Sequence, residues 1–258
     1  MSFLGHIGEL RKHLIRIVLA IIICALAVGL NITSIMDRFV LAPTRNDFYS
    51  LKWLNYLFKI AGSDVEIKFQ QNFFILTRKL YEEFNLSISV SMYLGLLIAF
   101  PYVIFEIWRF IKPALKPNER KNSFGYIIST IFFFLLGCAF GYFILSPLAI
   151  QFGFNYRATT LSHKQIEITD IIMTIVQCVF GMGVIFLLPV FTYALTAMGI
   201  LTPSFLKEYR RHSIVVILII AAIITPPDMI SMFIASIPLM ILYEFSVLVS
   251  KFVYKRLN

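Results

Sequence analysis

Hydrophobic residues along this chain fall into six runs that polar segments separate. The runs cover residues 14–32, 86–105, 124–150, 171–198, 213–225 and 229–249. Most of them reach the roughly 20 apolar residues that a helix needs to cross the hydrocarbon core of a bilayer. We therefore expect an all-α integral membrane protein with six transmembrane helices, built as one membrane domain over residues 1–258.

The fifth run, residues 213–225, is shorter than the others. As a helix it would be about 20 Å long at 1.5 Å per residue, against a hydrocarbon core of about 30 Å. A span this short must thin the bilayer, sit within protein or stop partway across. We expect short fifth and sixth spans, which suit a protein that hands a cargo across a deformed membrane better than they suit a solute carrier.

Prolines interrupt four of the runs, at Pro101, Pro147, Pro189 and Pro238. Inside a membrane helix, each proline frees a carbonyl group and favours a kink. Helices that curve around a shared concavity are one interpretation, and ordinary packing kinks are the other.

Basic residues indicate the orientation. Lys and Arg are denser in the short segments on the side of both termini than in the two long loops on the opposite side. Cytoplasmic loops carry this excess, so we expect both termini in the cytoplasm. The basic cytoplasmic segments and their attraction to anionic membrane lipid account for the net charge of +9. The charge pattern does not indicate nucleic-acid binding.

Composition supports a multi-pass membrane protein, because 59% of the residues are hydrophobic. Charged residues make up only 14%, whereas they make up about a quarter of soluble proteins. No small-residue cleavage site follows the first run, so we interpret it as a retained helix. Cys24, Cys138 and Cys178 lie in apolar runs and are interpreted as inert thiols. The sequence contains no hydrolase, zinc-protease or nucleotide-binding motif, and we expect no enzyme activity, metal or cofactor.

The loop at residues 31–85 is too long for a bare connection. Residues 49–60 and 73–84 both repeat apolar side chains with a helical period. We expect two short interfacial helices that cap the outer mouth of the bundle.

Carboxylates at the inner side are candidates for binding a cationic peptide, because they accept paired hydrogen bonds from guanidinium groups. Glu9 lies in an amphipathic segment, residues 1–13, where a local pair with Lys12 or His13 is the alternative interpretation. Glu106 ends an apolar helix, and Glu119 lies among basic residues that neutralise it in the alternative interpretation. At the outer side, Asp228 follows two prolines, as a helix N-cap does.

Four motifs occur in order along nearly the whole chain. They are the stretch from His6 to Arg11, the stretch from Phe100 through Trp108, Phe110 and Pro113 to Lys121, the turn from Thr225 to Asp228, and Tyr243-Glu244. Together they resemble TatC, the large subunit of the twin-arginine protein translocase.

The resemblance implies a cupped, concave bundle of six helices in the bacterial cytoplasmic (inner) membrane. It implies a receptor that binds twin-arginine signal peptides of folded proteins at the cytoplasmic face. Its partners would be single-span TatA- and TatB-type subunits, it would form a homo-oligomer within the receptor complex, and the proton-motive force would drive transport. The implied site residues are Glu9, Arg11, Phe110 and Glu119 for the signal peptide, Glu106 as an accessory inner-face group, Thr225 and Asp228 for partners at the outer hairpin, and Pro43 in the outer loop.

One position departs from the family pattern. Where relatives carry Glu or Gln two residues before a proline in the fourth span, this chain has Leu187. Gln177, Thr192 and Tyr193 are the polar side chains nearby that could replace it. If position 187 faces a polar concavity, Leu187→Glu should be tolerated.

Two other function classes remain at this stage. A secondary transporter would need ionisable residues near the membrane midplane and internal repeats, and the chain has few of the former and none of the latter. A structural scaffold for other membrane subunits is the third class. Export of a folded reporter with an Arg-Arg signal, with and without the chain, separates the three.

Overall fold

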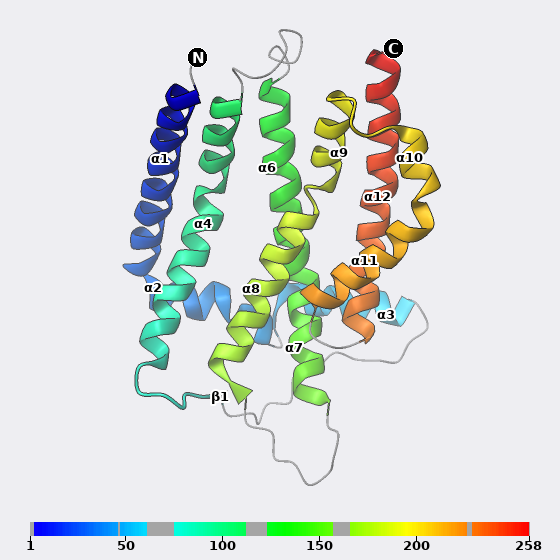
Figure 1. The fold of residues 1–258 in the computed structure, drawn as a ribbon. Coiled ribbons are helices and arrows are strands. Elements are labelled where there is room, and N and C mark those ends of the chain that lie inside the picture. Colours follow the sequence, from blue (N-terminus) through cyan, green and yellow to red (C-terminus); the bar gives the residue numbers. More distant parts are fainter. Residues whose placement is uncertain are drawn as a thin grey trace. The chain divides into compact units, whose positions relative to one another are not determined.

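Helices make up most of the computed structural model, which describes residues 3–45, 47–60, 75–111, 123–156, 166–225 and 229–257. Figure 1 shows the elements along the chain. They are α1 (Phe3–Gly29), α2 (Ile32–Ile35), the π-helical η1 (Met36–Val40), the 3-10 helix η2 (Ala42–Thr44), α3 (Tyr49–Ile60), β1 (Ile75–Leu76), α4 (Glu82–Ile111), α6 (Ser123–Phe140), the π-helical η4 (Gly141–Leu145), α7 (Ser146–Asn155), β2 (Ile166–Glu167), α8 (Ile168–Ile185), α9 (Leu188–Ala197), α10 (Pro203–Glu208), α11 (Arg210–Ile224) and α12 (Met229–Leu257).

The chain divides into two compact units. Unit 1 comprises Met1–Arg38 and Thr77–Phe132, and unit 2 comprises Phe39–Leu76 and Phe133–Asn258.

Five helical stretches are long and apolar enough to cross a membrane within the described residues. They are Gly8–Gly29, Glu82–Phe110, Gly125–Asn155, Ile168–Ala197 and Ser231–Lys255. The fifth hydrophobic run forms α11, whose 15 residues are fewer than the roughly 20 of a typical span. The prediction of a short sixth span is wrong, because α12 has 29 residues and continues past the apolar run through Lys251 and Lys255.

The helix predicted at residues 73–84 is also wrong over residues 75–81. Ile75 and Leu76 form a strand that pairs in parallel with Ile166 and Glu167, and the helix begins only at Glu82. The Glu82 carboxylate accepts hydrogen bonds from the backbone N–H groups of Arg78 (2.8 Å) and Lys79 (3.1 Å). These bonds hold the preceding turn and fix the start of α4. The helix predicted at 49–60, by contrast, has the bounds of α3.

The fourth hydrophobic run is two helices and not one. Helix α8 ends at Ile185, and α9 begins at Leu188 with Pro189 in its first turn. Pro189 has no N–H to continue the ladder of α8, and the Leu187 carbonyl instead accepts from the N–H groups of Val190 (2.9 Å) and Phe191 (3.0 Å). Pro101 and Pro238 remain inside α4 and α12.

Unit 1 is held together by the antiparallel packing of α1 on α4 (Figure 1). Small residues bring the two backbones close. A Cβ atom added at Gly95 would lie 2.7 Å from the backbone nitrogen of Ala25 and 2.8 Å from its Cα atom. Such close approach replaces the hydrophobic effect as the source of helix association in lipid, because it maximises van der Waals contact.

The core of unit 2 forms where η4, α8, α11 and α12 meet. The buried residues are Leu145, Ala149, Cys178, Met182, Phe186, Ile217, Ala221, Ile224, Ala235, Leu239, Leu242, Tyr243 and Val247. Glycines again allow close approach, since a Cβ atom at Gly141 would lie 2.4 Å from the carbonyl oxygen of Cys178. Tyr243 also donates a hydrogen bond to the carbonyl of Leu206, which joins α12 to α10.

Candidate functional site

The candidate signal-peptide residues that the structure describes lie on the two helices of unit 1. Glu9 and Arg11 are in the first turns of α1, and Phe110 is in the last turn of α4. Glu9 is half-buried and Arg11 is exposed. Glu119 and the motif residues around it lie outside the described residues, so their position relative to Glu9 stays a prediction.

The register of α1 against α4 places Glu9 and Phe110 at the same end of the helix pair. The His13 ring packs edge-on against the Phe110 ring, with the centroids 5.9 Å apart. Glu9 lies one helical turn before His13 and therefore on the same side of α1. Arg11, two residues after Glu9, points from a different side of the helix.

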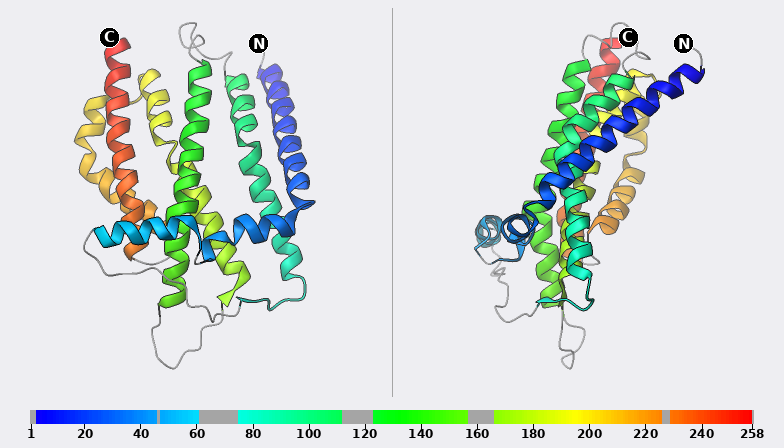
Figure 2. Two further views of the ribbon diagram at one scale, coloured as in Figure 1. Left: turned by 180° about the vertical axis from the view of Figure 1, so that it is seen from behind. Right: turned by 90° about the vertical axis from the view of Figure 1, so that its left-hand side faces the viewer.

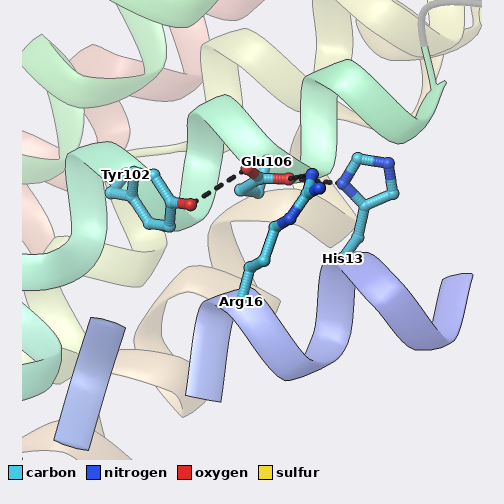
Figure 3. A network of polar contacts seen from close by, with 4 residues as sticks. All are labelled: His13, Arg16, Tyr102 and Glu106. Atoms are coloured by element: carbon cyan, nitrogen blue, oxygen red, sulfur yellow. Dashed lines mark hydrogen bonds and ion pairs between the residues drawn. The ribbon is translucent and has the colours of Figure 1, made fainter. Parts of the chain in front are cut away.

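Glu106 does not offer the open carboxylate that the sequence suggests. It is only 2% exposed and lies in a polar network between α1 and α4 (Figure 3). One oxygen accepts a hydrogen bond from the Tyr102 hydroxyl at 3.0 Å. The other is hydrogen bonded to Nδ1 of His13 and lies 3.9 Å from a guanidinium nitrogen of Arg16. The Glu106 carboxylate is thus engaged within unit 1, and its predicted role as an accessory inner-face group stays a prediction.

The polar network of His13, Arg16, Tyr102 and Glu106 was not predicted from the sequence. One signal was present, because His13 and Arg16 are three residues apart and share one face of α1. Tyr102 and Glu106 are four residues apart and share one face of α4 in the same way. Only the pairing of the two helices shows that these faces meet.

Of the outer-hairpin and outer-loop candidates, Thr225 and Pro43 are described and both are buried in unit 2. The Thr225 hydroxyl donates to the Ala221 carbonyl at 2.9 Å, within the end of its own helix. Pro43 lies in the first turn of η2. Asp228 lies outside the described residues.

The fourth-span position does not line an open polar surface. Leu187 is 8% exposed and packs inside unit 2, which removes the reason for expecting Leu187→Glu to be tolerated. Gln177 is already engaged, because its side-chain amide donates to the carbonyl of Ile223 at 2.7 Å. Thr192 is buried at 4% exposure. Thr192 therefore offers no group on an open surface, and the exposed Gln177 has its amide N–H group engaged within unit 2.

Comparison with known proteins decides the family. Residues 5–238 match the family described as Sec-independent protein translocase protein (TatC). The chain belongs to the TatC family. A TatC of Blattabacterium sp. subsp. Periplaneta americana is 39% identical over 258 residues, which cover 99% of this chain and 97% of that protein. A TatC of Halalkalibacterium halodurans is 33% identical over 259 residues, with coverage of 100% and 92%.

Solved structures agree. The chain is similar to a crystal structure of the twin-arginine translocase receptor TatC in DDM, with a TM-score of 0.72, 26% identity and coverage of 94% of this chain and 98% of that one. A second TatC receptor structure gives a TM-score of 0.66 at 28% identity, with coverage of 96% and 99%. This TatC family member is thus a multi-pass protein of the bacterial cytoplasmic membrane and part of the Sec-independent protein transport system. The family is a translocase component and not a known enzyme family.

Proposed function

We propose that the chain is the receptor of the twin-arginine export system and that it binds Arg-Arg signal peptides of folded proteins at the cytoplasmic face. The observation that carries this proposal is the placement of Glu9 and Phe110 at one end of the α1–α4 pair, within the segment that matches the family. A carboxylate and an aromatic ring at the same end of a helix pair suit an arginine, because the guanidinium group can pair with the first and stack on the second.

Glu119 supplies the second carboxylate of the proposed site, so that each arginine of the signal has one acidic partner. Arg11 lies in the same region of α1 and belongs to the same patch in this proposal, although it points from a different side of the helix than Glu9. A charge-assisted pair of this kind contributes roughly 1.5–3 kcal/mol. Two such pairs give enough binding energy to select Arg-Arg over a single arginine.

We also infer six membrane-crossing helices, with α11 as the short fifth span and both termini in the cytoplasm. We infer a cupped bundle from the family resemblance. The density of Lys and Arg in the terminus-side segments supports the cytoplasmic position of the termini. Single-span TatA- and TatB-type subunits dock near the outer hairpin of Thr225 and Asp228, and Pro43 belongs to the outer loop of the receptor. Several copies of the chain assemble in the receptor complex, and the proton-motive force drives transport.

The test is site-specific photo-crosslinking of an Arg-Arg signal peptide to the full chain in membranes. Glu9→Ala and Glu119→Ala should each reduce crosslinking about tenfold or more, given the pair energies above. If both carboxylates bind one Arg-Arg dipeptide, the double variant should reduce crosslinking by less than the product of the two single reductions. Glu83→Ala is the matched control, because Glu83 is an acid at the opposite end of α4.

Unchanged crosslinking in both single variants, with the proteins correctly inserted, would overturn the assignment of these acids. A peptide with Lys-Lys in place of Arg-Arg checks that recognition depends on the guanidinium fork and not on charge alone. Multiplicative effects of the two variants would make Glu9 a residue of the helix surface, separate from the site of Glu119.

A further inference from the structure

Helix α3 presents a row of large side chains that no described part of the chain covers. Tyr49 is 83% exposed, Trp53 65%, Tyr56 63% and Ile60 66%. Their spacing of four, three and four residues puts them on one side of the helix, and we call them the aromatic stripe. Leu51, on the opposite side, is 1% exposed and packs into unit 2.

The helix is docked against η4 of unit 2. Figure 2 shows α3 running crosswise to the rod of η4 and α7. Phe48, the residue before α3, stacks on Phe143 of η4 with the ring centroids 5.9 Å apart and the planes 10° apart. It also meets the Tyr142 ring edge-on at 5.6 Å. The aromatic stripe therefore faces away from the rod that holds the helix.

We propose that α3 is an interfacial helix whose aromatic stripe inserts into the lipid, at the boundary between headgroups and acyl chains. Tyr and Trp favour this zone, because the rings are apolar and the O–H or N–H group reaches water or headgroups. Lys52 and Lys59 are exposed and lie together on one flank of the stripe, where they reach lipid phosphates. The inference rests only on membrane residence and not on signal-peptide binding.

Continuity with the membrane-facing surface favours lipid over a second protein as the occupant. Phe143, on which Phe48 stacks, is itself 46% exposed on a helix that crosses the membrane. Phe39, whose carbonyl accepts from the Tyr142 hydroxyl, is 64% exposed. Exposed apolar rings therefore occur on the spanning rod and on η1 as well as on α3.

The chain offers a built-in test, because it has only two tryptophans, Trp53 and Trp108. In the full-length Trp108→Phe protein, reconstituted in phosphatidylcholine–phosphatidylglycerol vesicles, all indole emission comes from Trp53. We expect blue-shifted emission and strong quenching by lipids brominated near the headgroup end of the acyl chain. Lipids brominated near the terminal methyl group should quench less, and aqueous acrylamide least.

A matched control places the indole at Tyr156, an exposed aromatic residue at the end of α7. The Trp53→Phe, Trp108→Phe, Tyr156→Trp protein should show the opposite preference, with strong acrylamide and weak bromolipid quenching. If Trp53 is quenched by acrylamide and not by bromolipids, the stripe lies in water and the proposal fails. If neither agent quenches Trp53, protein covers the stripe and the proposal also fails. Should Trp108→Phe reduce folding, Trp108→Tyr gives the same readout.

Discussion

His13 and Glu106 are hydrogen bonded to each other although they lie 93 positions apart in the sequence. The contact joins α1 to α4 next to the end that carries Glu9 and Phe110. Glu106 is almost wholly buried, His13 is 15% exposed, and Arg16 is half exposed. A buried carboxylate is tolerated only when cations and donors surround it. The two helices therefore depend on each other chemically as well as sterically.

Glu106→Ala should destabilise unit 1 more than Glu106→Gln. The alanine leaves His13, Arg16 and the Tyr102 hydroxyl without their shared acceptor, at a cost of roughly 2–3 kcal/mol, whereas glutamine keeps an acceptor oxygen and loses less. Thermal unfolding in mild detergent measures the difference. Arg16→Gln is the control and should cost less than about 1 kcal/mol, because Arg16 is half exposed and 3.9 Å from the carboxylate. Equal stability of the two Glu106 variants would contradict this account.

Gly141→Ala should loosen the packing of η4 on α8. The new Cβ atom would lie 2.4 Å from the carbonyl oxygen of Cys178 and 2.8 Å from the Cα atom of Val179. Both neighbours are backbone atoms, so a helix must move, and such overpacking costs typically 1–3 kcal/mol. Gly153→Ala in α7 is the matched control, since nothing lies within 4 Å of its added Cβ atom. That variant should be neutral or slightly stabilising in the same unfolding assay.

Leu187→Glu should lower the stability of unit 2, whereas Leu187→Met should change it little. Position 187 is packed, so a carboxyl group there loses its hydration without a partner. Methionine keeps about the same apolar volume. Expression level and monodispersity in detergent report the difference. A Leu187→Glu protein as stable as the parent would show that this part of unit 2 opens to water in the membrane.

Lys207 should react faster with an amine acylating reagent than an ordinary exposed lysine. Its contact with the Lys251 side chain, and the positive charges of Lys251 and Arg210, lower the pKa of the Lys207 ammonium group. A lower pKa leaves more of the amine neutral, and hence nucleophilic, at any pH below that pKa. Mass spectrometry after brief acetylation measures the rate. Lys251→Gln should slow acetylation of Lys207 and leave that of the exposed Lys12 unchanged.

Hydrophobic patterning predicts the helices of this chain well, but not where they break. The apolar run at 171–198 is continuous in the sequence, and only the missing N–H of Pro189 and the turn at Phe186 and Leu187 divide it. At residues 75–81 the apolar period is helical, but backbone bonds to the Glu82 side chain delay the helix. In the first place a missing backbone donor, and in the second a local hydrogen bond, interrupts the helix although the periodicity is helical.

The candidate site could be predicted only in part. Glu9 and Phe110 follow from the family resemblance, and α1 and α4 carry them to one end of unit 1. The burial of Glu106 could not be predicted, because it depends on which face of α4 meets α1. That pairing is set by Gly95 and Ala25, small residues whose close approach has no signature in hydropathy.

The pairing of α1 with α4 also bears on how the protein is made. Helix α1 is synthesised first and enters the bilayer with His13 and Arg16 in the first half of its apolar span, from which the long Arg16 side chain extends toward the surface. Glu106 emerges about ninety residues later on an apolar helix, where a carboxylate facing lipid would oppose insertion. The His13 ring and the Arg16 guanidinium group, which accommodate it, are then already in the membrane. The order of synthesis thus supplies the carboxylate with its partners at the time when α4 must leave water.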